Sequence, residues 1–306
     1  MTTLVFGHKA PDTDSTGSPL IWEWFLNHTG MDAKAALLGT PNTEAKFVAE
    51  RWGFALPDII VDVDADQPCV IVDTNNPAEL PAGINAADVI AIIDHHKLAG
   101  GLETKNPINI TIRPLACTAT IMHQMMGEHA GHMPDGIKGL MLSCILSDTL
   151  AFRSPTTTPV DQDLAEALAK DLNIDIAKYA DEMFAAKSDV SAFSEAELLR
   201  MDSKEYAVDG KKFRVSVLET TSPKAVLDRK DALVTAMPDV AKEDGVDQVL
   251  LFVVDILREE ATMLVPNDLT KTVAEASFDT KVEGDTVVLP GVMSRKKQII
   301  PNLKLS

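Results

Sequence analysis

The 306-residue chain has few cysteines and no long apolar segment. Cys69, Cys117 and Cys144 show no paired spacing and lie in apolar stretches, so we expect buried, reduced thiols rather than disulfides or metal ligands. No run approaches the roughly 18 apolar residues that a membrane-spanning helix needs. The N-terminus lacks a basic segment followed by an apolar export segment. We therefore expect a globular protein of the cytoplasm with no membrane partner.

Basic residues are also scarce, because 28 Lys and Arg face 46 Asp and Glu and give a formal net charge of −18. A protein that binds nucleic acid normally presents a basic surface to the phosphate backbone, so this balance argues against a nucleic-acid partner. Any anionic substrate must meet local positive charge instead. The three consecutive cations Arg295, Lys296 and Lys297 are a candidate, although composition alone fits a solvated basic turn equally well.

The hydrophobic content of 45% can form a large core, and the length favours two domains. In the first half, short β-prone runs alternate with helical patterns, which predicts an α/β fold with a doubly wound, mostly parallel sheet. The expected helices include residues 19–27, 43–52 and 137–146, the second with Thr43 as its N-cap. The expected strands are residues 3–6, 35–38, 70–72, 89–93 and 109–112.

A break in the helical pattern after residue 187 indicates a domain boundary. We predict an N-terminal domain over residues 1–187, a linker over 188–194 and a smaller C-terminal α/β domain over 195–306. In the second domain a helix is expected at residues 223–237. Its expected strands are residues 212–218, 247–256, 261–265 and 286–289.

Polar side chains follow two of the expected strands where each ends. The run from Val89 to Ile93 leads into Asp94, His95 and His96, and the first strand leads into a loop with His8, Asp12 and Asp14. Open α/β sheets bind ligands at the carboxyl ends of their strands, and His with Asp suits first-row divalent ions. A loop can direct Asp12 and Asp14 to one point, whereas residues two apart do not share a helical face.

Asp73 and Asp148 also end apolar segments. Taken alone, an Asp-x-Asp loop is more often a solvated turn, and Asp73 reads as a turn or cap residue. Several apolar segments that each end in a carboxylate or an imidazole favour metal binding instead. Two divalent ions would neutralise the charge of these carboxylates. Carboxylates favour Mg²⁺ or Mn²⁺, the imidazoles favour Mn²⁺ or Co²⁺, and the lack of a nearby cysteine argues against structural zinc. The candidate ligands are His8, Asp12, Asp14, Asp73, His95 and Asp148.

These motifs resemble a known family. Asp94-His95-His96 is the motif that names the DHH phosphoesterase superfamily, and residues 7–15, GHKAPDTDS, resemble the first motif of the family II, manganese-dependent inorganic pyrophosphatases. Ser147-Asp148 follows in the expected order. Residues 202–206 and 294–298 resemble the two phosphate-binding motifs of that family's C-terminal domain.

The resemblance implies hydrolysis of pyrophosphate to two phosphates, by a water activated between two Mn²⁺ ions in an active site between the domains. Co²⁺ or Mg²⁺ are possible substitutes, further Mg²⁺ accompanies the substrate, and the chain forms a homodimer through an edge of the N-terminal sheet. One ion is held by His8, Asp12 and Asp73, and the other by Asp14, Asp73, His95 and Asp148, with Asp73 as the bridge.

By the same resemblance His96 lies beside the substrate, while Lys204, Arg295 and Lys296 hold its electrophilic phosphate. Asp94 supports the ligands, and Lys9 and Lys297 are supportive rather than catalytic. The alternatives are a short-chain polyphosphatase, another DHH phosphodiesterase or a non-catalytic pyrophosphate sensor. Three further histidines could suggest a second metal cluster, but they follow a methionine-rich helix and border glycines, so we expect a solvated helix end or loop. They are His123, His129 and His132.

Overall fold

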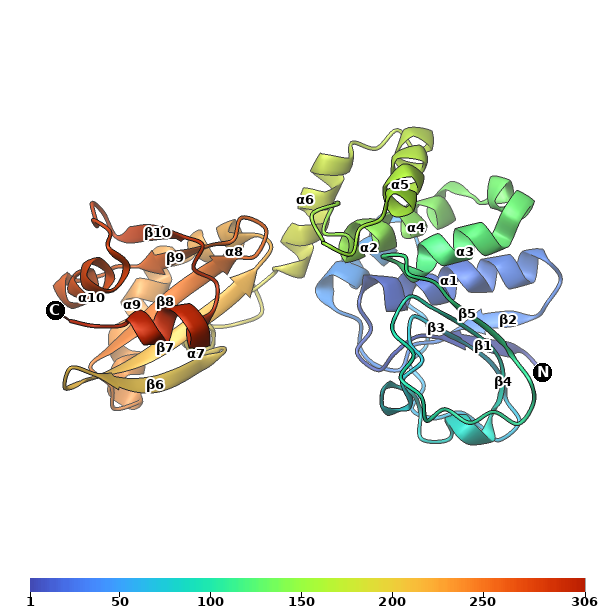
Figure 1. Ribbon diagram of the computed structural model, residues 1–306, viewed down its shortest axis with the longest axis horizontal. Helices are drawn as coiled ribbons and strands as arrows, with labels where there is room; N and C mark the ends of the chain where they lie inside the picture. Colours follow the sequence, from blue (N-terminus) through green and yellow to red (C-terminus); the bar gives the residue numbers. More distant parts are fainter. Residues whose placement is uncertain (306) are drawn as a thin grey trace. The chain divides into compact units, whose positions relative to one another are not determined.

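The computed structural model describes residues 1–305, which form two compact units that divide between Lys187 and Ser188. Figure 1 shows a sheet with associated helices in each unit, so the predicted α/β class is confirmed. Each unit is described by itself below. Every helix within residues 1–305 is too short or too polar to cross a bilayer.

The first unit has a five-stranded sheet in the order β2-β1-β3-β4-β5, and all its strand pairs are parallel. From β1 the chain crosses to β2 on one side and returns to β3 on the other. Such a reversal between two strands leaves a crevice at their carboxyl ends, where open α/β sheets bind ligands. The strands are β1 (Thr3–Phe6), β2 (Ala33–Ala35), β3 (Pro68–Val72), β4 (Asp88–Asp94) and β5 (Asn109–Ile112).

The two faces of this sheet are covered differently. Val5, Val70 and Ile93 point into a large core with α1, α3 and α4, whereas Phe6 and Ile71 pack against irregular segments and short 3₁₀ turns on the other face. Alternate residues of a strand point to opposite faces, so neighbouring residues reach different cores. The helices are α1 (Thr13–His28), α2 (Thr43–Arg51), α3 (Thr118–Met126), α4 (Asp135–Asp148), α5 (Pro159–Asp171) and α6 (Ile176–Lys187).

Several boundaries differ from those predicted. Helix α1 begins at Thr13 rather than at residue 19, because its first turns are polar and give no apolar periodicity, while Asp12 caps it. Helix α2 begins as expected, but its N-cap is Asn42 rather than Thr43. Strand β2 lies two residues earlier than predicted, and Leu37 makes only an isolated bridge to Ile59.

The second unit has a mixed sheet in the order β10-β9-β8-β7-β6, in which only β7 and β8 pair in parallel. Apolar cores lie on both of its faces. The predicted helix at 223–237 is two helices, and α7, β6 and α10 were not predicted. The elements are α7 (Glu195–Arg200), β6 (Ser203–Val208), β7 (Lys211–Thr220), α8 (Pro223–Leu227), α9 (Lys230–Glu243), β8 (Gln248–Asp255), β9 (Glu260–Leu264), α10 (Asp268–Phe278), β10 (Thr286–Pro290) and a π-helix, Arg295–Ile299.

Candidate metal centre

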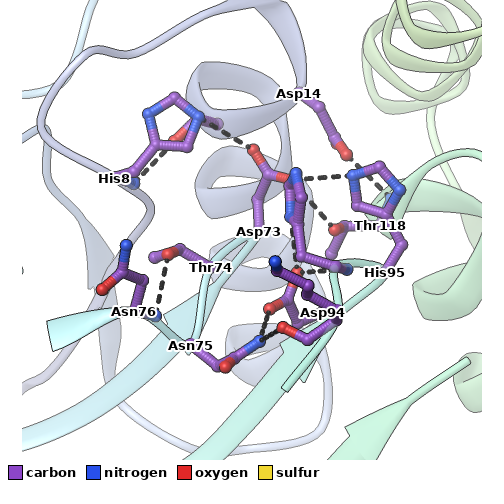
Figure 2. Close-up of polar contacts among 12 residues, drawn as sticks. His8, Asp14, Asp73, Thr74, Asn75, Asn76, Asp94, His95 and Thr118 are labelled. Atoms are coloured by element: carbon purple, nitrogen blue, oxygen red, sulfur yellow. Dashed lines mark hydrogen bonds and ion pairs between the residues drawn. The ribbon is translucent and has the colours of Figure 1, made fainter. Parts of the chain in front are cut away.

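Asp73 lies at the carboxyl end of β3, beside the point where the strand order reverses, and its residue is 1% exposed. One carboxylate oxygen, Oδ2, is 3.4 Å from Nε2 of His8, and the other, Oδ1, is 3.3 Å from Nε2 of His95. The hydroxyl of Thr118 donates a hydrogen bond to Oδ1 as well. Figure 2 shows Asp73 between the two imidazoles. The two carboxylate oxygens of Asp73 thus each contact a histidine, and these histidines follow two different strands.

The first candidate group consists of His8, Asp12 and Asp73, whose ligand atoms lie within 4.8 Å of one another. His8 follows β1 directly after Gly7, where any Cβ would overlap the Ser15 hydroxyl. That hydroxyl accepts the backbone N–H of His8 at 2.8 Å, and Asp12 accepts the N–H of Ser15 at 3.0 Å as the N-cap of α1. The start of α1 therefore holds both His8 and Asp12 in place.

Asp14 belongs to a different group, with Cys117 and Asp148. It lies in the first turn of α1, where it accepts the N–H of Thr118 at 2.7 Å and the hydroxyl of Ser18 at 2.6 Å. The expectation of a loop that directs Asp12 and Asp14 to one point was therefore wrong. Because Asp12 is the cap and Asp14 a helical residue two positions later, their side chains point in different directions and belong to different candidate groups.

The third group contains Asp73, His95 and His96. Asp73 thus belongs to two of the groups, as a bridging ligand requires. Asp148 is the last residue of α4, rather than a loop residue after it, and its buried Oδ2 has no hydrogen-bond partner within the described part of the chain. Buried carboxylate oxygens are normally satisfied, so this oxygen has an unmet need for a cation or donor.

The electrostatics of the cluster also indicate missing positive charge. Burial raises the pKa of Asp14, and the nearby charge of Asp73 raises it further. Burial likewise raises the pKa of Asp148 well above its usual range, with Asp14 adding to the effect. Burial opposes the charged form of His95, but the hydrogen bond to Asp73 and the surrounding carboxylates outweigh it and raise its pKa to about 9. Without a metal, protons supply the positive charge that these groups need.

Oxygen and imidazole donors of this kind fit a hard-to-borderline divalent ion such as Mn²⁺. Such an ion would satisfy the orphaned oxygen of Asp148, and its charge would counter the burial that raises the pKa values of Asp14 and Asp148. The candidate ligands therefore fit a divalent-metal centre.

Asp94 and His96 form a pair beside this cluster. Asp94 accepts the backbone N–H of His96 at 3.0 Å and lies 2.9 Å from its Nδ1, while Asn75 donates to the other oxygen at 2.5 Å. Burial opposes ionisation of Asp94, but these hydrogen bonds lower its pKa below the usual value. With Nδ1 of His96 held in this way, Nε2 is the nitrogen that can reach a ligand. His96 lines a cavity of about 380 Å³ together with His8, Lys9 and Lys97.

Cys117 is a correction to the sequence prediction. Its Sγ lies within 4.8 Å of ligand atoms of Asp14 and Asp148, so a cysteine does lie near the motifs in space. Burial raises the pKa of this thiol well above its usual value, and Asp14 and Asp148 raise it further. Cys117 therefore lies buried beside these two candidate ligands.

Glu44 is a buried residue that the sequence did not single out, with an exposed fraction of 0%. Its Oε2 accepts hydrogen bonds from the hydroxyls of Thr13 at 2.9 Å and Ser147 at 2.8 Å, and Lys187 Nζ lies 3.2 Å away. Thr13 lies between Asp12 and Asp14, and Ser147 precedes Asp148. Glu44 therefore ties together the two helix ends that present carboxylates to the centre. In sequence it is only an acidic residue in the first turn of α2.

The expected phosphate-binding residues all lie in the second unit. Lys204 is exposed on β6, and Arg295 and Lys296 begin the π-helix and line a cavity of about 360 Å³ with Asp202. The guanidinium of Arg295 donates to the Asp202 carboxylate at 2.8 Å and to its backbone carbonyl. Lys297 is exposed in the same π-helix, and its backbone N–H donates to the Ser294 hydroxyl at 3.3 Å.

The chain matches known families over nearly its whole length. The N-terminal domain of the DHH family matches residues 2–147, and the DHHA2 domain matches residues 181–305. A protein of Lactobacillus helveticus named "Probable manganese-dependent inorganic pyrophosphatase" is 36% identical over 302 residues, which are 98% of this chain and 97% of that protein. A protein of the same name from Deinococcus radiodurans is 38% identical over 305 residues, with the same coverage. A solved family II inorganic pyrophosphatase structure from Methanococcus jannaschii covers 98% of both chains, with 33% identity and a TM-score of 0.60.

Proposed function

This chain belongs to the family of manganese-dependent inorganic pyrophosphatases, and from that membership we propose that it hydrolyses inorganic pyrophosphate to two phosphates with bound divalent metal. The observation that carries the proposal is the position of Asp73, whose two oxygens face His8 and His95. We assign one ion to His8, Asp12 and Asp73, and the other to Asp14, Asp73, His95 and Asp148.

Divalent ions at such a site supply Lewis acidity and a water of lowered pKa. The chain contributes the geometry around them. Asp94 holds the ring of His96 through Nδ1, which leaves Nε2 free to hold or move a proton at a substrate oxygen in the cavity that His96 lines. The Asn75 amide donates to Asp94 and so keeps that carboxylate oriented.

We assign Lys204, Arg295 and Lys296 to the electrophilic phosphate. A planar guanidinium can bind two phosphate oxygens, and lysine adds a mobile positive charge. Arg295 is paired with Asp202, so substrate binding must replace that carboxylate with phosphate oxygens. This exchange of one anion for another makes the site selective for a highly charged ligand, and we assign supportive roles to Lys9 and Lys297.

We further propose two Mn²⁺ per chain, with Co²⁺ or Mg²⁺ as substitutes and additional Mg²⁺ bound with pyrophosphate. The three cysteines are free and buried, which suits the reducing cytoplasm. For a homodimer, the edge strand β5 is the suitable surface, because Ile110 on it is 55% exposed and its outer backbone is open to pairing. Light scattering of the purified chain tests the dimer, and cell fractionation tests the compartment.

Phosphate release from three substrates tests the activity. Pyrophosphate, tripolyphosphate and a dinucleotide are each incubated with Mn²⁺ and with Mg²⁺ alone. We expect rapid release from pyrophosphate with Mn²⁺ and none from the dinucleotide. Failure on pyrophosphate in the presence of Mn²⁺ overturns the proposal, and faster release from tripolyphosphate identifies a polyphosphatase instead.

A further inference from the structure

Three histidines gather at the end of α1 that is remote from the metal centre. His28 is the last residue of α1, and His129 and His132 lie in a 3₁₀ helix, Gly127–His132. One ring nitrogen from each lies within 4.8 Å of the other two. The ring centroids are 5.4 Å apart for His28 with His129, 5.4 Å for His28 with His132, and 6.2 Å for the third pair. We call these three residues the histidine cluster.

Local structure explains why these side chains meet. In a 3₁₀ helix side chains three residues apart are eclipsed, so His129 and His132 lie on one side of it. His28 reaches them from α1, whose 16 residues span about 24 Å and separate the cluster from Asp14. His123, which we had grouped with His129 and His132 from the sequence, is not in the cluster. The third member comes from a segment a hundred residues earlier.

His129 provides a second, independent observation. Its Nδ1 is buried and has no hydrogen-bond partner among residues 1–305. Phe25 packs edge-on against this ring at 6.0 Å, and Trp24 stacks on His28 at 5.1 Å. These aromatic contacts do not give that nitrogen a polar partner. Buried polar atoms without partners are uncommon and indicate a missing ion, water or ligand.

We propose that the histidine cluster binds a transition-metal ion of the Zn²⁺ class, separately from the carboxylate-rich centre. An all-imidazole set selects Zn²⁺, Ni²⁺ or Cu²⁺ over Mn²⁺ and Mg²⁺, and three histidines with an open fourth position suit zinc. The partial negative charge at the C-terminus of α1 also favours a cation beside His28. Zinc–nitrogen bonds of about 2.0–2.1 Å require the nitrogens to be about 3.4 Å apart, and the exposed His28 and His132 side chains can rotate to reach it.

Metal analysis of the full chain tests this site. The protein is kept in excess Mn²⁺, dialysed against a lower concentration of Zn²⁺ and analysed for both metals. We expect the wild-type chain to hold about one more zinc than His28→Gln or His132→Gln. Any zinc that replaces manganese in the carboxylate centre does so equally in all variants. The difference in zinc content between the wild type and a histidine variant therefore measures binding at the histidine cluster alone. His123→Gln is the matched control and should bind as much zinc as the wild type.

Fluorescence gives a second readout that is independent of activity. Because Trp24 stacks on His28, Cu²⁺ in the cluster should quench its emission, and Trp24→Phe should remove this quenching while zinc uptake remains. Thermal unfolding in Mn²⁺ identifies any variant that fails to fold, and the second histidine variant then replaces it. Equal zinc content in the wild type and both histidine variants, or Cu²⁺ quenching that survives His132→Gln unchanged, overturns the proposal.

Discussion

The bridging role of Asp73 can be tested by the substitution Asp73→Asn. Asp73 has a left-handed backbone, with φ of +57°, which asparagine adopts more readily than most residues. The amide keeps the size of the side chain and one coordinating oxygen but removes the negative charge. Since Asp73 belongs to the groups of both His8 and His95, we expect both ions to bind more weakly.

The magnitude follows from the distances around this carboxylate. A bound ion would lie no farther from these oxygens than the imidazole nitrogens do, at 3.3 and 3.4 Å, and at such a separation two unit charges interact by about 5 kcal/mol at an effective dielectric constant of about 20. The remaining amide oxygen offsets part of this loss. We therefore expect the Kd for each ion to rise by at least about 10²-fold, since about 1.4 kcal/mol corresponds to a factor of ten.

Calorimetric titration with Mn²⁺ and metal analysis after dialysis measure both sites. Asp12→Asn is the matched control, because Asp12 belongs to the group of His8 alone and its loss should spare the second ion. If Asp73→Asn keeps two ions per chain at the same free Mn²⁺, the bridging assignment is wrong. It is also wrong if Asp12→Asn weakens both ions to the same extent.

Three further predictions concern other parts of the chain. Glu44→Ala should destabilise the first unit by about 2 kcal/mol, because it leaves the buried hydroxyls of Thr13 and Ser147 without their acceptor, and should lower its melting temperature by about 5 °C. Glu44→Gln can still accept from both hydroxyls and should lose far less. Arg295→Ala should leave the metal content unchanged and reduce turnover or raise KM. The control Asp202→Ala removes the partner of Arg295 and should not raise KM. Loss of metal in Arg295→Ala contradicts the assignment of Arg295 to the substrate phosphate. Folding raises the pKa values of His95, Asp14 and Asp148, so the metal-free chain binds more protons when folded than when unfolded. Its free energy of unfolding should therefore fall as the pH rises from about 6.5 through 9. Urea unfolding with a chelator measures that slope, and Mn²⁺, which displaces those protons, should remove it.

Strands β1, β3 and β4 of the first unit were predictable because they are largely buried and bounded by clear breaks. Strand β5 was predicted with its observed bounds, and β3 and β4 within two residues. Pairing and order were not derivable from local pattern, because they depend on contacts between segments far apart. Strand β6 was missed since its residues are mostly exposed and charged, and neither burial nor periodicity marked the strand that carries Lys204.

The sequence predicted the site residues that follow strands from their residue types, but it did not predict where the helices begin and end around the site. Asp73 and His95 were recognisable because a buried apolar run ends at each. The polar residues 13–18 concealed the first turn of α1, so Asp14 was placed in a loop. Glu44 and Cys117 reach the centre only through tertiary packing, and His28 joins His129 in the same way. No spacing in the sequence marks such residues, because the chain brings them together from separate helices.

The carboxylates of the centre differ in how much they depend on a cation. Asp12 and Asp14 lie at the N-terminus of α1, where the helix dipole favours negative charge, and backbone N–H groups of Ser15 and Thr118 donate to them. Asp148 lies at the C-terminus of α4, where the dipole has the opposite sign, and its buried Oδ2 has no hydrogen-bond donor among residues 1–305. The donors to Asp14 thus offset part of the effect of its burial, although its pKa is still raised, whereas that oxygen of Asp148 has no such compensation. Asp148 is consequently the carboxylate whose ionisation depends most on bound metal.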